Sequence, residues 1–235
     1  MSMLPGRQES WRRDPRAGAA VIVAGVAFAA FLALAAAILL APAFIRFDLA
    51  LSDAIRGIAL PGLRQAARFA TWVGDFWPMT VLTALAAGAF AFAGKRTSAV
   101  MLLVAVPLGA GLGNLLKLAF MRARPAVDAL IDMPHSYSFP SGHAVTSFVF
   151  FATLAFLAVL HRSSLRRSAL YVALCVFAAA SIALSRVYLG VHYLGDAVGG
   201  WLFGSAWLAL VVLVFARWGT GDAETPARPP AGAEG

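Results

Sequence analysis

A histidine followed four residues later by an aspartate is the first arrangement in this sequence that could do chemistry. His192 and Asp196 meet if they lie on one helical turn, because residues at i and i+4 are neighbours on a helix surface. A carboxylate that accepts a hydrogen bond from one imidazole nitrogen orients the ring and leaves the other nitrogen free to attack. The spacing predicts an oriented nucleophile, although a purely structural His–Asp pair would have the same spacing.

A second histidine, His143, ends the tetrapeptide Pro140-Ser141-Gly142-His143, directly before a long apolar run. Ser141 is suited to cap the N-terminus of a helix, and Gly142 allows a ligand to approach the backbone closely. The free N–H groups and the positive end of the helix dipole favour an anion there. His143 could then act as a proton donor beside that anion; the alternative is a capping turn whose histidine takes no part in chemistry.

Cations accompany both histidines. Lys117 and Arg124 are seven residues apart, nearly two helical turns, so they share a face if the helix continues that far before Pro125 ends it. Two cations on one face could bind a phosphate, or they could be residues at a helix end that extend their charges to water. Arg122 points elsewhere on such a helix and is interpreted as a residue without a role in the site. Arg186 adds a third cation, six residues before His192.

The elements that must position these residues are membrane-spanning helices. Of the 235 residues, 61% are hydrophobic and 13% charged, and the mean hydropathy is +0.80, which argues against a soluble globule. Six uncharged runs are long enough for the about 17–25 residues that cross a bilayer, the first with length to spare: Ala17–Ile45, Phe76–Gly94, Thr97–Leu116, Ala144–Leu160, Ser168–Ser185 and Ala197–Ala216. The predicted fold class is all-α, with six transmembrane helices in one domain (residues 17–218) between polar tails at 1–16 and 219–235.

The positions of the basic residues predict the orientation. Eleven of the 19 Lys and Arg residues precede the first run, separate the second from the third or the fourth from the fifth, or follow the sixth. The positive-inside rule makes that side, with both termini, cytoplasmic. The net charge of +8 then reflects topology and attraction to anionic lipid, and no binding to nucleic acid is expected. The segments that carry the two histidines fall on the outer face, which is the periplasmic face if the membrane is a bacterial inner membrane.

The segment between the first two runs has a different pattern. Apolar residues recur at steps of three and four, opposite polar ones, which predicts a short amphipathic helix in the periplasmic interface: Phe44, Phe47, Leu51, Ile55 and Ile58 against Asp48, Ser52, Asp53 and Arg56. Trp72 and Trp77 are expected to anchor the following span at the interface. His135 and His161 match no motif and are interpreted as solvated.

The three polar segments together resemble the type 2 phosphatidic acid phosphatase (PAP2) superfamily. Its pattern is Lys-x6-Arg-Pro, then Pro-Ser-Gly-His, then Ser-Arg-x5-His-x3-Asp. Every fixed position is present here: Lys117, Arg124 and Pro125; Pro140, Ser141, Gly142 and His143; Ser185, Arg186, His192 and Asp196. The motifs cover roughly residues 117–196, and the six-helix layout extends the resemblance to nearly the whole chain.

The resemblance implies a mechanism with no metal or other cofactor. His192 would attack phosphorus and form a phosphohistidine while Asp196 orients it. The phosphate oxygens would be held by three cations and the start of a helix: Lys117, Arg124 and Arg186, with Ser141 and the N–H of Gly142. His143 would protonate the departing oxygen and then activate water.

The substrate implied is a membrane lipid phosphate or pyrophosphate, such as undecaprenyl pyrophosphate, phosphatidylglycerophosphate, phosphatidate or a lipid A phosphate. A lipid phosphotransferase could use the same site, and a transporter or lipid-phosphate-binding protein could use the same cations. Transporters often place their sites at the midplane between paired halves, whereas these charges lie at helix ends. The related vanadium haloperoxidases are soluble, so six spans argue against them. The oligomeric state is left open.

Overall fold

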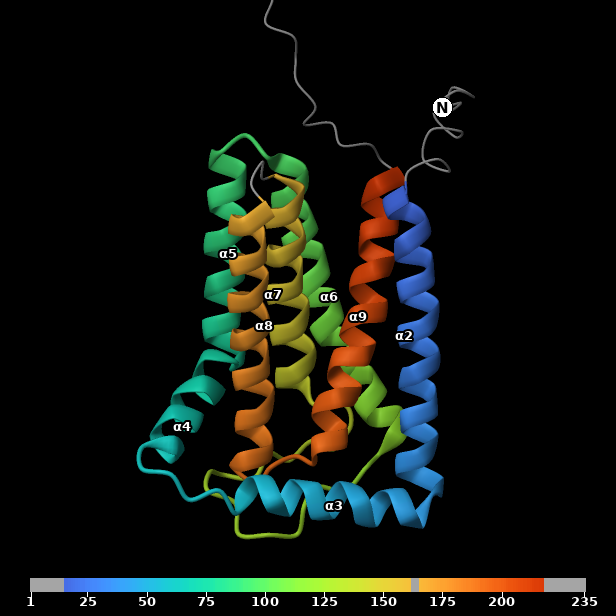
Figure 1. The fold of residues 1–235 in the computed structure, drawn as a ribbon, viewed down its shortest axis with the longest axis vertical. Coiled ribbons are helices and arrows are strands. Elements are labelled where there is room, and N and C mark those ends of the chain that lie inside the picture. Colours follow the sequence, from blue (N-terminus) through green and yellow to red (C-terminus); the bar gives the residue numbers. More distant parts are fainter. Residues whose placement is uncertain (1–14, 162–164, 218–235) are drawn as a thin grey trace, which may run out of the picture.

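In the computed structural model, residues 15–161 and 165–217 are described, and they form eight helices (Figure 1). In chain order these are α2 (Pro15–Leu40), α3 (Pro42–Arg56), α4 (Leu63–Val73), α5 (Phe76–Phe92), α6 (Arg96–Phe120), α7 (Gly142–Leu160), α8 (Leu165–Tyr188) and α9 (Leu194–Arg217). The all-α prediction is confirmed. The predicted polar tails, 1–16 and 219–235, lie outside the described residues except for the first two residues of α2.

Five helices are long and apolar enough to cross a bilayer: α2, α6, α7, α8 and α9. α5 has 17 residues, and with α4 it forms a pair, bent by 60°, that meets the same criterion as one broken span. At 1.5 Å per residue α5 alone is about 25 Å long, close to the ~30 Å of a hydrocarbon core. We therefore treat α5 as the sixth span.

The long helices run alongside one another, with α2 packed on α9, and α7 in contact with α6, α8 and α9 (Figure 1). α2 begins and α9 ends at the same end of the bundle, as an even number of crossings requires. α3 lies crosswise at the opposite end, where α6 and α8 end and α7 and α9 begin (Figure 1). The segments that carry the polar motifs therefore meet at the α3 end of the bundle.

The first span is shorter than its uncharged run. α2 stops at Leu40, and Pro42 is the first residue of α3, where a proline fits because the first N–H of a helix has no partner within it. α3 is the predicted amphipathic helix, but only part of its polar face, including the exposed Asp53, is open to water. Asp48 and Ser52 are buried against the bundle, whereas Phe47 remains exposed. α4, which the sequence pattern did not predict, is a second short helix at this end.

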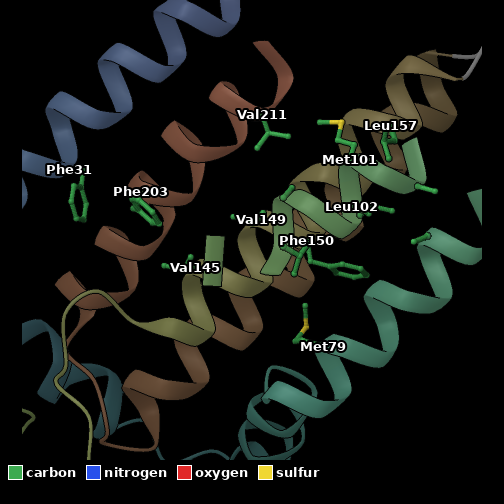
Figure 2. Close-up of a cluster of buried hydrophobic side chains, with 14 of the residues drawn as sticks. Phe31, Met79, Met101, Leu102, Val145, Val149, Phe150, Leu157, Phe203 and Val211 are labelled. Carbon is green, nitrogen blue, oxygen red and sulfur yellow. The ribbon is translucent and has the colours of Figure 1, made fainter. Parts of the chain in front are cut away.

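Aromatic side chains fix the loop between α6 and α7 to the core. Phe139 of that loop stacks on Phe31 of α2, with ring centroids 5.5 Å apart, and meets Phe120 edge to face at 5.1 Å. Phe31 also contacts Phe203 of α9 at 5.8 Å, and Figure 2 shows these two rings between α2 and α9. Because Phe139 directly precedes Pro140, this packing determines where the Pro-Ser-Gly-His segment lies.

Candidate active site

The predicted His–Asp pair forms where α9 begins. His192 lies two residues before the helix and Asp196 in its first turn, and His192 Nδ1 is 3.2 Å from Asp196 Oδ2. The Ser138 hydroxyl donates a hydrogen bond to the same carboxylate oxygen and lies 3.2 Å from Nδ1. All three side chains are buried. The i, i+4 spacing thus joins the pair, although only Asp196 is helical.

Arg124 determines the tautomer of His192. Its Nη1 is 3.2 Å from His192 Nε2, and because a guanidinium can only donate, Nε2 accepts and the ring proton lies on Nδ1. Burial lowers the pKa of His192 to about 3, although the hydrogen bond to Asp196 and the charge of that carboxylate oppose the shift. The ring is therefore neutral near pH 7, with the lone pair of Nε2 directed at a cation.

The three predicted cations are held by neutral acceptors. Lys117 and Arg186 are buried, Arg124 is partly buried, and Lys117 lies close enough to the other two to be repelled by them. Besides the contact of Arg124 with His192, their hydrogen bonds go to carbonyls and two hydroxyls: Lys117 to Tyr137 O at 2.7 Å, Arg124 to Ser136 O and Val191 O at 2.7 Å each and to Ser136 Oγ at 3.1 Å, and Arg186 to Thr71 Oγ1.

These cations have unused binding capacity. In residues 15–161 and 165–217, none of Lys117, Arg124 and Arg186 forms an ion pair with a carboxylate, and Arg186 Nε has no hydrogen-bond partner. Burying unpaired cations is unfavourable unless an anion binds beside them. The cluster therefore favours a ligand with several negatively charged oxygens, as a phosphoryl group has.

Lys117 and Arg124 do not share a helix face, contrary to the prediction. α6 ends at Phe120, before Pro125, and Met121 adopts a left-handed conformation with φ 45°. Arg124 lies in the irregular segment that follows, and its hydrogen bonds to backbone carbonyls hold its side chain at the site. The two cations thus come together by tertiary structure and not by helical periodicity.

Ser141 occupies the N-cap position of α7, as predicted, but its hydroxyl does not cap the helix. Ser141 Oγ is buried and has no hydrogen-bond partner in the described part of the chain, while Ser141 N–H donates to the Asp196 carbonyl at 3.0 Å. α9 approaches closely because residue 200 is glycine; a Cβ there would lie 3.0 Å from Ser141 O and 2.7 Å from Ala144 Cβ. An unpartnered hydroxyl beside the N–H groups of Gly142 and His143, which have no acceptor within the helix, adds donors for an anion.

His143 has a carboxylate partner that the sequence analysis missed. Its Nε2 is 3.0 Å from Asp75 Oδ1 and 3.2 Å from the Thr71 carbonyl. An imidazole that donates Nε2–H to these acceptors keeps Nδ1 for exchanging a proton with a ligand. Asp75 lies between α4 and α5, and Thr71 also binds Arg186, so this short segment supports two site residues.

Arg122, which was interpreted as having no role, is the partner of Asp196, and this interpretation is wrong. Arg122 Nη1 donates to Asp196 Oδ1 at 2.6 Å, and Nη2 donates to Asp48 Oδ2 at 2.8 Å. The guanidinium carbon also lies 4.1 Å from the centre of the Tyr193 ring. Both carboxylates are buried, and burying an unpaired charge costs free energy. The bridge reduces this cost because the guanidinium pairs with both carboxylates.

Polar side chains of α3 accept hydrogen bonds from the N-terminus of α9. Leu194 N–H donates to Ser52 Oγ at 2.9 Å, and Gly195 N–H donates to Asp48 Oδ1 at 2.7 Å. These are N–H groups of the first helical turn, which have no acceptor within the helix. α3 therefore holds the turn that carries Asp196, both through the backbone and through Arg122.

Comparison with known proteins identifies the family. The family model of the PAP2 superfamily matches residues 98–219, just over half of the chain, including all three motif segments. Phosphatidylglycerophosphatase B of Bacillus subtilis is 32% identical over 160 residues, which cover 67% of this chain and 77% of that protein. This chain belongs to the PAP2 superfamily.

Other PAP2 relatives agree with this assignment. Lipid A 1-phosphatase of Rhizobium johnstonii is 34% identical over 123 residues, and the chain spans less than half of that protein, 44%. The crystal structure of a transmembrane PAP2-type phosphatidylglycerolphosphate phosphatase from Bacillus subtilis superposes with a TM-score of 0.70 at 30% identity, covering 80% of this chain and 94% of that one. Aquifex aeolicus LpxE shares the fold at 22% identity, with a TM-score of 0.56 over 70% of this chain and 93% of that one.

Two histidines lie outside the PAP2 motifs. His135 is exposed, as predicted. His161, also predicted to be solvated, is instead packed: Nε2 lies 2.8 Å from Ser98 Oγ and the ring contacts Phe90, at the end of α7 remote from α3. Within the described ranges, no three His, Cys, Asp or Glu side chains form a group suited to a metal ion.

Proposed function

We propose that this PAP2 protein is an integral-membrane phosphatase that hydrolyses a lipid phosphate or pyrophosphate through a phosphohistidine on His192. The observation that carries the proposal is the cluster of cations without carboxylate partners around the neutral Nε2 of His192. A nucleophile oriented by a carboxylate is not needed for binding alone, so the arrangement favours catalysis over transport.

In the first step the lone pair of His192 Nε2 attacks phosphorus, and the bond from phosphorus to the leaving oxygen breaks. Asp196 stabilises the imidazolium as Nδ1–H is held, and His143 gives its proton to the leaving oxygen. Lys117, Arg124 and Arg186 stabilise the charge that builds on the other phosphate oxygens. In the second step His143 removes a proton from water, water attacks phosphorus, and the P–N bond breaks to release phosphate.

The lipid nature of the substrate is supported by a cavity beside the site. A cavity of about 570 Å³ lies between α5, α6 and α7, with Gly142 and His143 in its wall and largely apolar residues elsewhere. A phosphate held at the start of α7 would place an attached hydrocarbon chain beside or within this cavity. The relatives named above are lipid phosphatases, which agrees with such a substrate.

We expect phosphate release by the purified protein from at least one lipid in a panel of phosphatidate, phosphatidylglycerophosphate, lipid A 1-phosphate and undecaprenyl pyrophosphate. Release should survive excess EDTA, because fixed cations stabilise the transition state, and vanadate should inhibit it by imitating five-coordinate phosphorus. Activity that EDTA removes and magnesium restores would contradict the mechanism. Phosphate recovered on a lipid acceptor instead of in water would identify a phosphotransferase.

The site is proposed to face the periplasm, on the charge distribution described above. Val127, which is 36% exposed between α6 and α7, gives a place to test this. In a Cys175→Ser background, Val127→Cys should react with a membrane-impermeant thiol reagent in intact spheroplasts. Arg96→Cys, at the start of α6, is the matched control and should react only after lysis; the reverse pattern would overturn the orientation.

A further inference from the structure

The cavity beside His143 has one wall formed by a single face of α6. Residues at steps of three and four along that helix line it: Leu103, Val106, Pro107, Ala110, Gly111 and Asn114. The space beside Gly111 is open, because a Cβ at that position would meet no heavy atom within 4 Å. The face ends one turn before Lys117, so the cavity leads from the hydrocarbon-facing helices to the cation cluster.

Asn114 is the unexpected residue on this face. Its side chain is exposed, and no residue in the described ranges forms a hydrogen bond with its amide. By contrast, the hydroxyls of Thr80 and Thr83 in the same cavity donate to carbonyls of their own helix, each at 2.7 Å. An amide without a partner in an apolar environment is unfavourable, so its presence in a membrane helix indicates a ligand group that it binds.

The position of Asn114 relative to the phosphate site suggests which group that is. An ideal Cβ on Gly142 would lie 3.8 Å from Lys117 Cε and 4.0 Å from Asn114 Oδ1, so the lysine and the amide face the same point at the start of α7. Along α6 the amide is one turn, about 4.5 Å, further into the bundle than Lys117. A lipid whose phosphate binds at the cations would therefore bring the atoms a few bonds below phosphorus to Asn114.

Those atoms differ between lipid classes. In a diacylglycerol phosphate they include ester carbonyls, which accept hydrogen bonds from an amide NH₂. In a polyprenyl pyrophosphate only hydrocarbon follows the phosphate groups, and the Asn114 amide would be left without a partner as the lipid displaced water.

We propose that Asn114 is a specificity-determining residue that donates a hydrogen bond to an ester carbonyl of a diacylglycerol phosphate, and so favours glycerophospholipids over polyprenyl phosphates. This proposal rests on the proposed lipid phosphatase function and names the substrate class of the same site.

The test compares two lipids that differ only in those carbonyls: diacyl phosphatidate and its dialkyl ether analogue. Wild-type protein should prefer the ester by about tenfold in kcat/KM, the value of one net hydrogen bond. Asn114→Leu should lose this preference by slowing ester turnover, with ether turnover unchanged within about twofold, which also shows that the variant is folded. Thr80→Val, in the same cavity but with a hydroxyl already bonded to its own helix, should keep the wild-type ratio.

Polyprenyl pyrophosphate turnover should not fall in Asn114→Leu. An equal loss for all three lipids would place the amide on the phosphate and overturn the inference, as would a wild-type ester-to-ether ratio near one. Binding of the ester and ether lipids is compared separately, from the rise in the Tm of the protein as the concentration of each lipid is increased. A wild-type protein that hydrolyses none of these lipids and none of the panel named above would contradict the proposed function, while the ratio of ester to ether binding would still decide the role of Asn114.

Discussion

Replacing His192 with alanine is expected to abolish turnover of every lipid substrate, because no phosphoenzyme can form without Nε2. Removing a covalent nucleophile in other enzymes costs on the order of 10⁶-fold in kcat. Single-turnover labelling with a substrate carrying radioactive phosphorus should give labelled wild-type protein and unlabelled His192→Ala protein. Label retained in the variant would show that another residue is the nucleophile.

His143→Ala provides the comparison, because its effect should depend on the leaving group. An alcohol that leaves from a phosphate monoester has a pKa comparable to the ~15.7 of water, whereas a phosphate that leaves from a pyrophosphate has one near ~6. General acid catalysis typically raises the rate about 10²–10⁴-fold, and the increase is largest for the poorer leaving group. His143→Ala should therefore slow labelling from phosphatidate more than labelling from a polyprenyl pyrophosphate, and phosphohistidine should accumulate because water is no longer activated. An equal defect for both lipids would show that the roles are wrongly assigned.

Replacing Arg122 with methionine should have the second large effect. The variant would keep much of the side-chain volume but leave Asp48 and Asp196 buried without their shared cation. Removing one partner of a buried ion pair typically costs about 3–5 kcal/mol of stability. A displaced Asp196 would also misorient His192, and small misplacements of reacting groups can cost about 10²-fold in rate.

For Arg122→Met we therefore expect a lower Tm together with a fall in kcat, with little change in KM, because the phosphate-binding cations are untouched. Arg64→Met, at an exposed arginine on α4, is the matched control and should resemble wild type. A rise in KM at constant kcat would instead assign Arg122 to substrate binding. Unchanged stability and unchanged kcat would show that the bridge seen here does not form in the membrane.

The comparison between sequence and structure separates local from long-range information. The apolar runs predicted the spans because a bilayer requires continuous hydrocarbon along each crossing, whatever the neighbouring helices are. His192 and Asp196 could be paired from spacing because four residues are one helical turn. The same reasoning failed for Lys117 and Arg124, since it assumed that α6 continues past Phe120.

Asp75 and Asp48 could not be assigned from the sequence for a related reason. Both lie, with Asp53, in the one segment between the first two apolar runs, where a carboxylate is typical of a solvated interfacial residue. Their partners, His143 and Arg122, lie 68 and 74 residues further along the chain, in segments that meet them only when the bundle forms.

The sequence by itself determined the number and approximate bounds of the spans, the amphipathic helix between the first two spans, and the residues of the three motifs. Only the tertiary structure decided that α3 turns Asp48 and Ser52 inward, that Arg122 bridges two buried carboxylates, and that Asn114 faces the cavity without a hydrogen-bond partner among the described residues. The physical reason is that side-chain type and helical period are local properties. Which of several cations or carboxylates becomes buried, paired or left free depends on helices far apart in the chain and on the few angles at which they pack.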